Sequence, residues 1–185
     1  MRLRYRLHRG CRVPFRHRNI RLRPANYVGQ RSYFITICCA GRRPVFANPS
    51  KANWLIDVLR KQAAPHRFGV TAYCVMPDHL HALVSGLDTR SDLLAFVKNF
   101  KQSTSREYLQ RWHRPLWEKK FYDHILRPND NAAGIAGYIW LNPVRKGLCN
   151  HPREYPYSGS FVLDWKRTML LLEIWAPDWK AKPPA

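Results

Sequence analysis

The chain has 185 residues, the length of one ordinary domain with room for a substantial core. Lysine and arginine outnumber aspartate and glutamate by 32 to 12, so the formal net charge is +20 at pH 7. Such an excess attracts polyanions and makes their binding depend strongly on salt. A membrane surface would also attract this charge, but no apolar run reaches the roughly 20 residues that a helix needs to span a bilayer. The composition therefore predicts nucleic acid as the partner and no membrane.

The first 31 residues hold ten arginines and no acidic residue. A segment of this kind is an organellar presequence, a disordered tail or an arm that lies along nucleic acid, and we favour an arm over residues 1–30. Arginines interrupt every apolar stretch that could form the core of a secretory signal, so we expect a cytoplasmic protein, associated with the nucleoid of a bacterium. The arginines that we nominate as DNA contacts in this arm are Arg2, Arg4, Arg6, Arg12, Arg16, Arg18, Arg21 and Arg23.

The cysteines show no pattern of a metal site or a disulfide framework. They are odd in number and none forms a CxxC pair, which argues against a zinc ribbon and against paired disulfides. We expect five reduced structural residues: Cys11, Cys38, Cys39, Cys74 and Cys149.

The first half of the chain alternates strand and helix signals. Residues 33–39 are β-branched and aromatic, which predicts a strand. A helix follows, with Ser50 as its N-cap and apolar residues at helical spacing up to Pro65. Residues 70–75 and 79–85 predict two further strands, and the Met-Pro-Asp sequence between them predicts a short turn. We therefore expect a β-hairpin after the first helix.

The second half predicts a helix, a strand and another helix. Residues 91–111 have an amphipathic helical pattern with Ser91 as N-cap, and residues 121–126 form a short apolar strand. A third helix is predicted over residues 129–142, and Pro143 places its end or a kink at Asn142. Two glycines weaken this helix, so we hypothesise that it is mobile.

The order strand, helix, strand, strand, helix, strand is the ferredoxin-like pattern. The predicted fold class is α+β, with an antiparallel sheet, two helices on one face and an additional helix. We expect the folded domain to cover residues 31–150 and residues 151–185 to form a tail that packs on or near it.

Two pairs of polar residues carry candidate chemistry. His79 and His81 flank Leu80 in a predicted strand, and alternate residues of a strand point to the same face. Tyr138 and Asn142 lie four residues apart in the predicted third helix, so they project from one face about one turn apart. Taken alone, each has a structural interpretation: the histidines as incidental strand residues, the tyrosine as a core aromatic, and the asparagine as a turn or cap residue.

Four segments together resemble one known family. They are MPDHLHALV, FKQSTS, WEKKFYDHILR and YIWLNPVRKGLC, and they occur in that order. This set is similar to the signatures of the REP-associated tyrosine transposases, which belong to the single-tyrosine HUH superfamily, and the similarity spans roughly residues 30–160. The resemblance implies the ferredoxin-like fold, with the nucleophilic tyrosine on the additional helix.

The resemblance also implies a mechanism. Tyr138 would attack a DNA phosphodiester to give a 5′-phosphotyrosine and a free 3′-hydroxyl, and a second attack would rejoin DNA without ATP. A divalent ion, Mg²⁺ or Mn²⁺, would be held by His79, His81 and Asn142, although imidazole also suits zinc. Asn142 replaces the glutamine of related insertion-sequence transposases. The implied substrate is single-stranded DNA that folds as REP-like hairpins, and we expect a monomer, with a dimer as the alternative.

Other basic side chains are candidates for DNA contacts, against the simpler interpretation of surface charge or strand-end packing. They are Lys98, Lys101, His124, Arg127 and Arg145.

Two rival functions predict different experimental results. A non-catalytic basic nucleic-acid-binding protein would bind DNA or RNA but form no covalent adduct. A metal-dependent phosphodiesterase that activates water would still cleave DNA after Tyr138→Phe.

Overall fold

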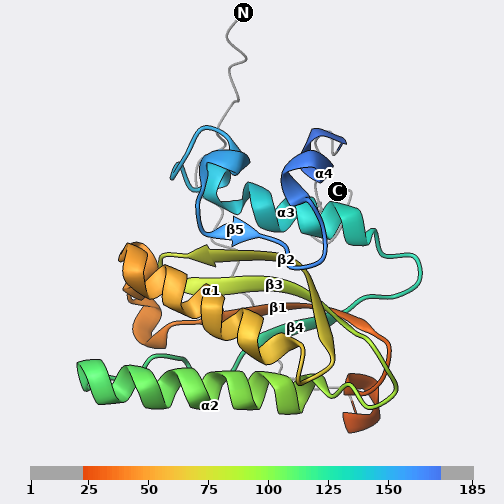
Figure 1. Ribbon diagram of the computed structural model, residues 1–185, viewed down its shortest axis with the longest axis horizontal. Helices are drawn as coiled ribbons and strands as arrows, with labels where there is room; N and C mark the ends of the chain where they lie inside the picture. Colours follow the sequence, from red (N-terminus) through yellow and green to blue (C-terminus); the bar gives the residue numbers. More distant parts are fainter. Residues whose placement is uncertain (1–22, 172–185) are drawn as a thin grey trace, which may run out of the picture.

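The structure, a computed structural model, describes residues 23–171, and it contains one five-stranded antiparallel sheet (Figure 1). The order of the strands across the sheet is β4-β1-β3-β2-β5, and its first four members have the ferredoxin-like arrangement. The predicted strand and helix order is therefore confirmed. The strands are β1 (Ser32–Cys38), β2 (Phe68–Met76), β3 (His79–Gly86), β4 (Tyr122–Ile125) and β5 (Ser158–Gly159).

Helices cover both faces of the sheet. Helices α1 and α2 pack on one face, whereas α3 packs on the other (Figure 1). The α-helices are α1 (Pro49–Ala63), α2 (Leu93–Trp112), α3 (Ala132–Arg145) and α4 (Trp165–Leu171). Short 3₁₀ turns are η1 (Pro24–Tyr27), η2 (Ala40–Arg42), η3 (Val45–Ala47) and η4 (Pro152–Glu154).

Strand β3 shows how sequence alternation assigns residues to the two faces. Leu80 and Ala82 are fully buried in the core beneath α1 and α2. Leu83 belongs to the core beneath α3, and strand alternation places His79 and His81 on that same side. The prediction that the histidines share a face while Leu80 enters the main core is confirmed.

The predicted N-cap of the first helix was wrong. The cap is Asn48, whose side-chain oxygen accepts a hydrogen bond from the backbone N–H of Lys51 at 3.1 Å, and Ser50 lies inside the helix. Pro49 occupies the first helical position, where its fixed φ and missing N–H are tolerated, so the helix starts before the serine.

The predicted N-cap of α2 was also wrong, because the cap lies one residue later than Ser91. Asp92 accepts a hydrogen bond from the backbone of Ala95 at 3.0 Å. The buried hydroxyl of Ser91 instead donates to the carbonyl of Arg67 and accepts from the backbone N–H groups of the turn that precedes α2. Ser91 thus closes the turn between β3 and α2.

Helix α3 begins at Ala132 and continues to Arg145, so the predicted start at residue 129 and the predicted end at residue 142 were each three residues too early. Pro143 lies inside it and cannot donate to the carbonyl of Ile139 four residues earlier. The side-chain amide of Asn142 donates to the Tyr138 carbonyl at 2.8 Å and to the Ile139 carbonyl at 3.4 Å. Asn142 therefore satisfies the carbonyl that proline leaves without its helical donor.

The segments outside residues 31–150 contribute to the fold where they are described. Tyr27 is buried, and its hydroxyl donates to Asp123 at 2.8 Å. After α3, β5 adds a short strand beside β2, and the Tyr155 hydroxyl donates to the carbonyl of Val75 at 2.9 Å. Within the arm, Arg23 precedes η1 and is exposed, whereas the nominated arginines from Arg2 to Arg21 lie outside the described residues.

The four described cysteines, Cys38, Cys39, Cys74 and Cys149, are free thiols as predicted, and Cys11 lies outside the described range. Among residues 23–171, no helix is long and apolar enough to cross a membrane.

Candidate active site

The two histidines of β3 face each other directly. The Nε2 atoms of His79 and His81 are 2.9 Å apart, their rings are almost perpendicular, and both side chains are more than 90% buried. Two ligand atoms at right angles around one ion, each about 2.1 Å from it, lie about 3.0 Å apart. The pair therefore has the separation of two neighbouring ligands of an octahedral ion.

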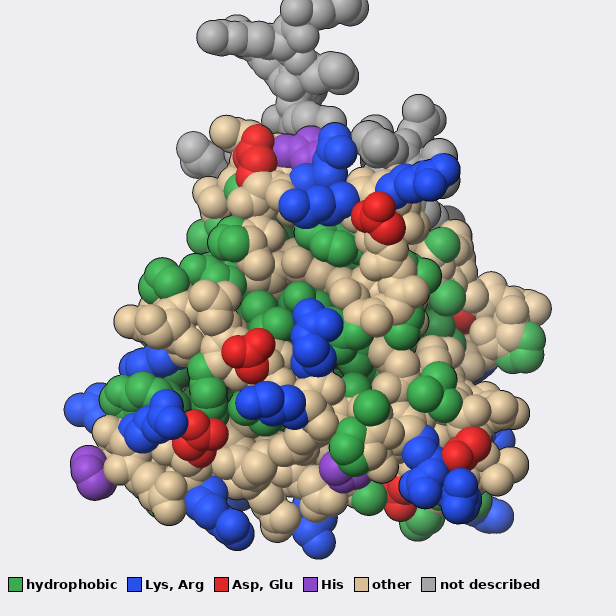
Figure 2. All heavy atoms as spheres, in the orientation of Figure 1, with side chains coloured by type: hydrophobic (Ala, Val, Ile, Leu, Met, Phe, Trp, Pro, Cys, Tyr) green, Lys and Arg blue, Asp and Glu red, His purple; other side chains and the backbone are tan. Residues whose placement is uncertain are grey.

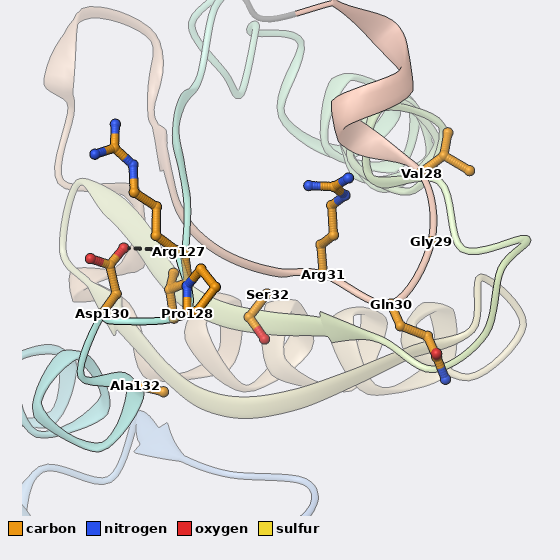
Figure 3. Close-up of a pocket in the computed structure, with 10 residues that line it drawn as sticks. Val28, Gly29, Gln30, Arg31, Ser32, Arg127, Pro128, Asp130 and Ala132 are labelled. Carbon is orange, nitrogen blue, oxygen red and sulfur yellow. Dashed lines mark hydrogen bonds between the residues drawn. The ribbon is translucent and has the colours of Figure 1, made fainter.

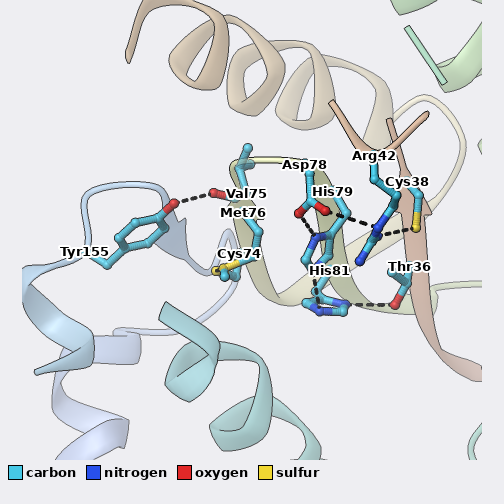
Figure 4. A network of polar contacts seen from close by, with 10 residues as sticks. All are labelled: Thr36, Cys38, Arg42, Cys74, Val75, Met76, Asp78, His79, His81 and Tyr155. Carbon is cyan, nitrogen blue, oxygen red and sulfur yellow. Dashed lines mark hydrogen bonds and ion pairs between the residues drawn. The ribbon is translucent and has the colours of Figure 1, made fainter. Parts of the chain in front are cut away.

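The outer nitrogen of each histidine has its own polar partner (Figure 4). The Nδ1 of His79 lies 2.5 Å from Asp78 Oδ1, and the Nδ1 of His81 lies 2.8 Å from the hydroxyl oxygen of Thr36 on β1. An ionised carboxylate can only accept, so His79 Nδ1 carries a proton and its Nε2 is left with a lone pair. A carboxylate behind a histidine is the arrangement that orients ligands in metal sites.

Thr36 allows His81 to adopt either neutral tautomer, because a hydroxyl both donates and accepts hydrogen bonds. With its proton on Nε2, His81 donates to the His79 lone pair, which accounts for the 2.9 Å contact. With its proton on Nδ1, His81 donates to Thr36 and presents a second lone pair beside that of His79. This second state is the one that can bind a cation.

Asp78 is held in its ionised form. Partial burial opposes ionisation, but the hydrogen bond from His79, the electrostatic attraction of that ring and the charge of Arg42 outweigh it and lower the pKa of Asp78. Arg42 Nε lies 3.1 Å from Asp78 Oδ2, and a terminal nitrogen of Arg42 donates to Cys38 Sγ at 2.8 Å (Figure 4). Arg42 has a positive φ of 54°, a conformation that non-glycine residues seldom adopt. The backbone around η2 thus brings a guanidinium to the histidine pair.

Tyr138 projects from α3 onto the same face of the sheet. Its ring centroid is 6.4 Å from that of His81 and 6.1 Å from that of Phe34, with an edge-to-face geometry to Phe34. Arg145, one of the nominated DNA contacts, places its guanidinium carbon 4.8 Å from the centroid of the Tyr138 ring. The structure therefore brings the predicted nucleophile, one predicted metal ligand and one predicted basic contact together.

Asn142 lies one turn beyond Tyr138, as predicted, and is also more than 90% buried. Its amide nitrogen is engaged by helix carbonyls, which fixes the side chain and leaves the amide oxygen as the group suited to a cation. Among residues 23–171, no group of three or more His, Cys, Asp or Glu side chains forms a metal site. The side chains that could hold a divalent ion are thus the two imidazoles of β3 and the amide oxygen of Asn142 on α3.

The remaining nominated contacts lie elsewhere. Lys98 is exposed on α2, across the sheet from the histidine pair. The ammonium of Lys101 donates to the carbonyls of Glu118 and Lys119, which gives it a structural role in the loop before β4. His124 bonds Asp130 at 2.9 Å. Basic side chains are spread over the face shown in Figure 2 and do not form a single patch.

Two hollows lie away from this chemistry, at the other end of β1, and include Arg127 in their walls. Sequence reasoning missed them, as it missed the supporting roles of Asp78, Thr36 and Arg42. The role of Asp78 could have been predicted from the sequence, because Asp78 directly precedes His79. The role of Thr36 depends on the register between β1 and β3, in which Thr36 pairs with His81.

The fold and the site together define a class: a ferredoxin-like domain with a paired-histidine site on one strand and a tyrosine on a helix across that face of the sheet. The sequence profile of the family described as "Transposase IS200 like" matches residues 27–139. The chain belongs to this family of transposases, which are DNA-processing enzymes.

Similar proteins agree with this assignment. The chain is 27% identical over 162 residues to a Haemophilus influenzae protein assigned to the REP-associated tyrosine transposases, covering 82% of this chain and 88% of that protein. It is 25% identical over 150 residues to the REP-associated tyrosine transposase of Escherichia coli, covering 75% and 87%. A solved REP-associated tyrosine transposase bound to a REP hairpin has the same fold, with a TM-score of 0.63, 20% identity and coverage of 77% of this chain and 84% of that one. The resemblance inferred from the four motifs is confirmed.

Proposed function

We propose that the protein is a metal-dependent endonuclease and strand transferase that cuts single-stranded DNA at REP-type hairpins through a 5′-phosphotyrosine. The observation that carries this proposal is the position of Tyr138 beside a histidine pair whose Nε2 atoms are 2.9 Å apart. A structural pair of histidines does not need a tyrosine and an amide from a separate helix on the same face. A metal-assisted attack by tyrosine needs all of them.

In the proposed reaction, the Tyr138 oxygen forms a bond to the scissile phosphorus, the phenolic proton is lost, and the bond from phosphorus to the 3′-oxygen breaks. The departing oxygen takes up a proton and becomes a free 3′-hydroxyl. No cofactor is consumed, because the phosphotyrosine ester replaces the phosphodiester. Attack by a 3′-hydroxyl on that ester reverses these bond changes and joins DNA.

The chain supplies the positions that the reaction requires. His79, His81 and Asn142 would hold Mg²⁺ or Mn²⁺, which when bound polarises the phosphate and offsets its developing charge. Asp78 holds the proton of His79 on the nitrogen that faces away from the site, and Thr36 accepts a hydrogen bond from His81 when the His81 proton is on Nδ1. Arg145 lies against the phenol ring of the nucleophile and is placed to attract the phosphate.

The proposed substrate and assembly rest on three supports. The formal charge of +20 favours DNA, and similar proteins are REP-associated tyrosine transposases, one of them solved with a REP hairpin. One chain brings Tyr138 to its own His81, so the candidate site is complete without a second copy. We accordingly propose a monomer that acts on DNA hairpins.

The test uses labelled hairpin DNA, Mn²⁺ and denaturing electrophoresis. We expect a protein-linked band with the unmodified protein and its loss with Tyr138→Phe. Tyr108→Phe is the matched control, because Tyr108 is a buried tyrosine of α2 on the opposite side of the sheet. Cleavage that persists in Tyr138→Phe would favour a hydrolase that uses water. Binding without an adduct or cleavage would favour a non-catalytic binding protein.

A further inference from the structure

Two adjoining hollows lie at the edge of the sheet where β4 ends. Their volumes are about 610 Å³ and 330 Å³, and both are lined by Arg31, Leu126, Arg127 and Pro128. Both volumes fall within the range of roughly 300–1,000 Å³ that is typical of ligand sites. In Figure 3, Arg31 and Arg127 rise from two different segments on either side of the space between them.

The two arginines of these hollows form no ion pair with the acidic residues that the structure describes, although the backbone hydrogen bond and the charge of Arg127 help to lower the pKa of the nearby Asp130. Both are exposed, and neither guanidinium forms a hydrogen bond or ion pair with the residues that the structure describes. The carboxylates in the walls are already engaged: Asp130 accepts from the Arg127 backbone N–H and bonds His124, and Asp123 accepts from a tyrosine hydroxyl. An anion entering the site would therefore meet two guanidinium groups whose donors are available.

The first residue of α3 also lines the larger hollow. Ala132 lies at the N-terminus of this 14-residue helix, the end at which the helix dipole favours negative charge. The dipole adds to the attraction of Arg31 and Arg127. All three features favour a phosphate over a neutral ligand.

Strand β4 connects the hollows to the candidate active site. Thr36, which supports His81, pairs with Tyr122 at one end of β4, and Leu126 just beyond its other end bonds the backbone of Ser32 in the hollow. Ser32 lies six residues before Cys38, which pairs with His79, and six residues correspond to about 20 Å along β1. At the rise of about 3.4 Å per nucleotide of a stacked strand, this distance is about six nucleotides, and fewer if the strand is extended.

Tyr122 provides an intermediate contact. It is 39% exposed, and its ring packs edge-to-face on Phe34, which also contacts Tyr138. An exposed aromatic ring in this position is a platform on which an unpaired base can stack. The route from the histidine pair to the hollows is thus lined by an aromatic side chain before it reaches the arginines.

We propose that Arg31 and Arg127 bind the phosphodiester backbone of the DNA strand that is cut at Tyr138, at a point several nucleotides from the scissile phosphate. This inference rests on the proposed function and names a second binding site on the same substrate. Free nucleotides and inorganic phosphate share the chemistry of the ligand, but only a continuous strand uses the connection along β4.

The test compares affinities for labelled hairpin DNA carrying a single-stranded extension of about four or about ten nucleotides, on the 5′ or the 3′ side. Binding is measured by fluorescence anisotropy without metal, so that no cleavage is required. For the unmodified protein we expect the longer extension to bind about tenfold more tightly on one of the two sides. We expect Arg31→Gln with Arg127→Gln to abolish most of this gain and to reduce the salt slope by about 1 to 2, because two phosphate contacts are lost.

The matched control is Arg106→Gln with Arg153→Gln, which removes two exposed arginines of α2 and η4 outside the hollows. This control should retain the gain from the longer extension. An equal loss in both double variants would overturn the proposal, since it would reflect net charge alone. An unchanged gain in Arg31→Gln with Arg127→Gln, or no gain in the unmodified protein, would overturn it as well.

Adduct formation is scored separately on the shorter hairpin with Mn²⁺. If the unmodified protein forms no adduct but the affinity gain depends on Arg31 and Arg127, the proposed nuclease fails while the binding site stands. If the adduct forms and the gain does not depend on them, only the binding site fails.

Discussion

Thr36→Val should weaken metal binding without removing any candidate ligand. Thr36 Oγ1 lies 2.8 Å from His81 Nδ1. When the Nε2 lone pair of His81 faces a cation, Nδ1 carries the proton and Thr36 accepts its hydrogen bond. Valine has nearly the same shape and favours strands, so β1 should persist. A neutral hydrogen bond contributes about 1 kcal/mol, about a factor of five in affinity, and loss of a partner that supports a metal-binding histidine typically lowers metal affinity 10- to 100-fold.

We therefore expect Thr36→Val to bind Mn²⁺ about tenfold more weakly, as measured by isothermal titration calorimetry on the metal-free protein. Asp78→Asn should lose more, toward 100-fold, because a charged hydrogen bond is stronger than a neutral one. Thr36→Ser keeps the hydroxyl and is the control. A Thr36→Val affinity within about twofold of the unmodified protein, or a Thr36→Ser loss as large as that of valine, would refute the tautomer argument.

Three further predictions concern stability and DNA binding. Tyr155→Phe removes a buried hydrogen bond to a carbonyl of β2 and should lower the free energy of unfolding by about 1–2 kcal/mol in urea titration, whereas no change would show that water replaces the hydroxyl. Burial raises the pKa of Tyr33 from 10.0 to about 12, so the unfolded chain releases this proton first, and stability should fall as pH rises from 10 to 12. Tyr33→Phe should show a shallower fall over that interval, and an equally steep one would assign the effect to other groups. Deletion of residues 1–22 should weaken hairpin binding and reduce its salt slope, since it removes eight arginines, and an unchanged slope would contradict the proposed arm.

The fold was predictable because its local signals agree with one another. Alternation in β3 placed Leu80 in the core and the histidines on the opposite face, and the order of strands and helices indicated the sheet topology. The helix boundaries were less accurate, because the side chains of Asn48 and Asp92 cap the helices while the nearby serines do not. Several residues in each segment are chemically able to cap, and only the backbone path selects one of them.

The site was predictable as a set of residues but not as a geometry. Spacing alone placed Tyr138 and Asn142 one turn apart, and it placed the histidines side by side. The hydrogen bond from Asn142 to the carbonyl that Pro143 leaves without a donor explains how an asparagine and a proline fit inside α3, where the sequence predicted an end or a kink of the helix. Thr36 and the Arg31 hollows depend on how distant strands pair, and such information is not contained in any local pattern.

The central claim is that Tyr138 is the residue that becomes linked to DNA. The most direct measurement is to trap the adduct on a hairpin with Mn²⁺, digest the protein and the DNA, and identify the modified peptide by mass spectrometry. We predict a single modified peptide that contains Tyr138 joined to the 5′-phosphate of a nucleotide. A linkage to another residue, or a linkage through a 3′-phosphate, would contradict the account.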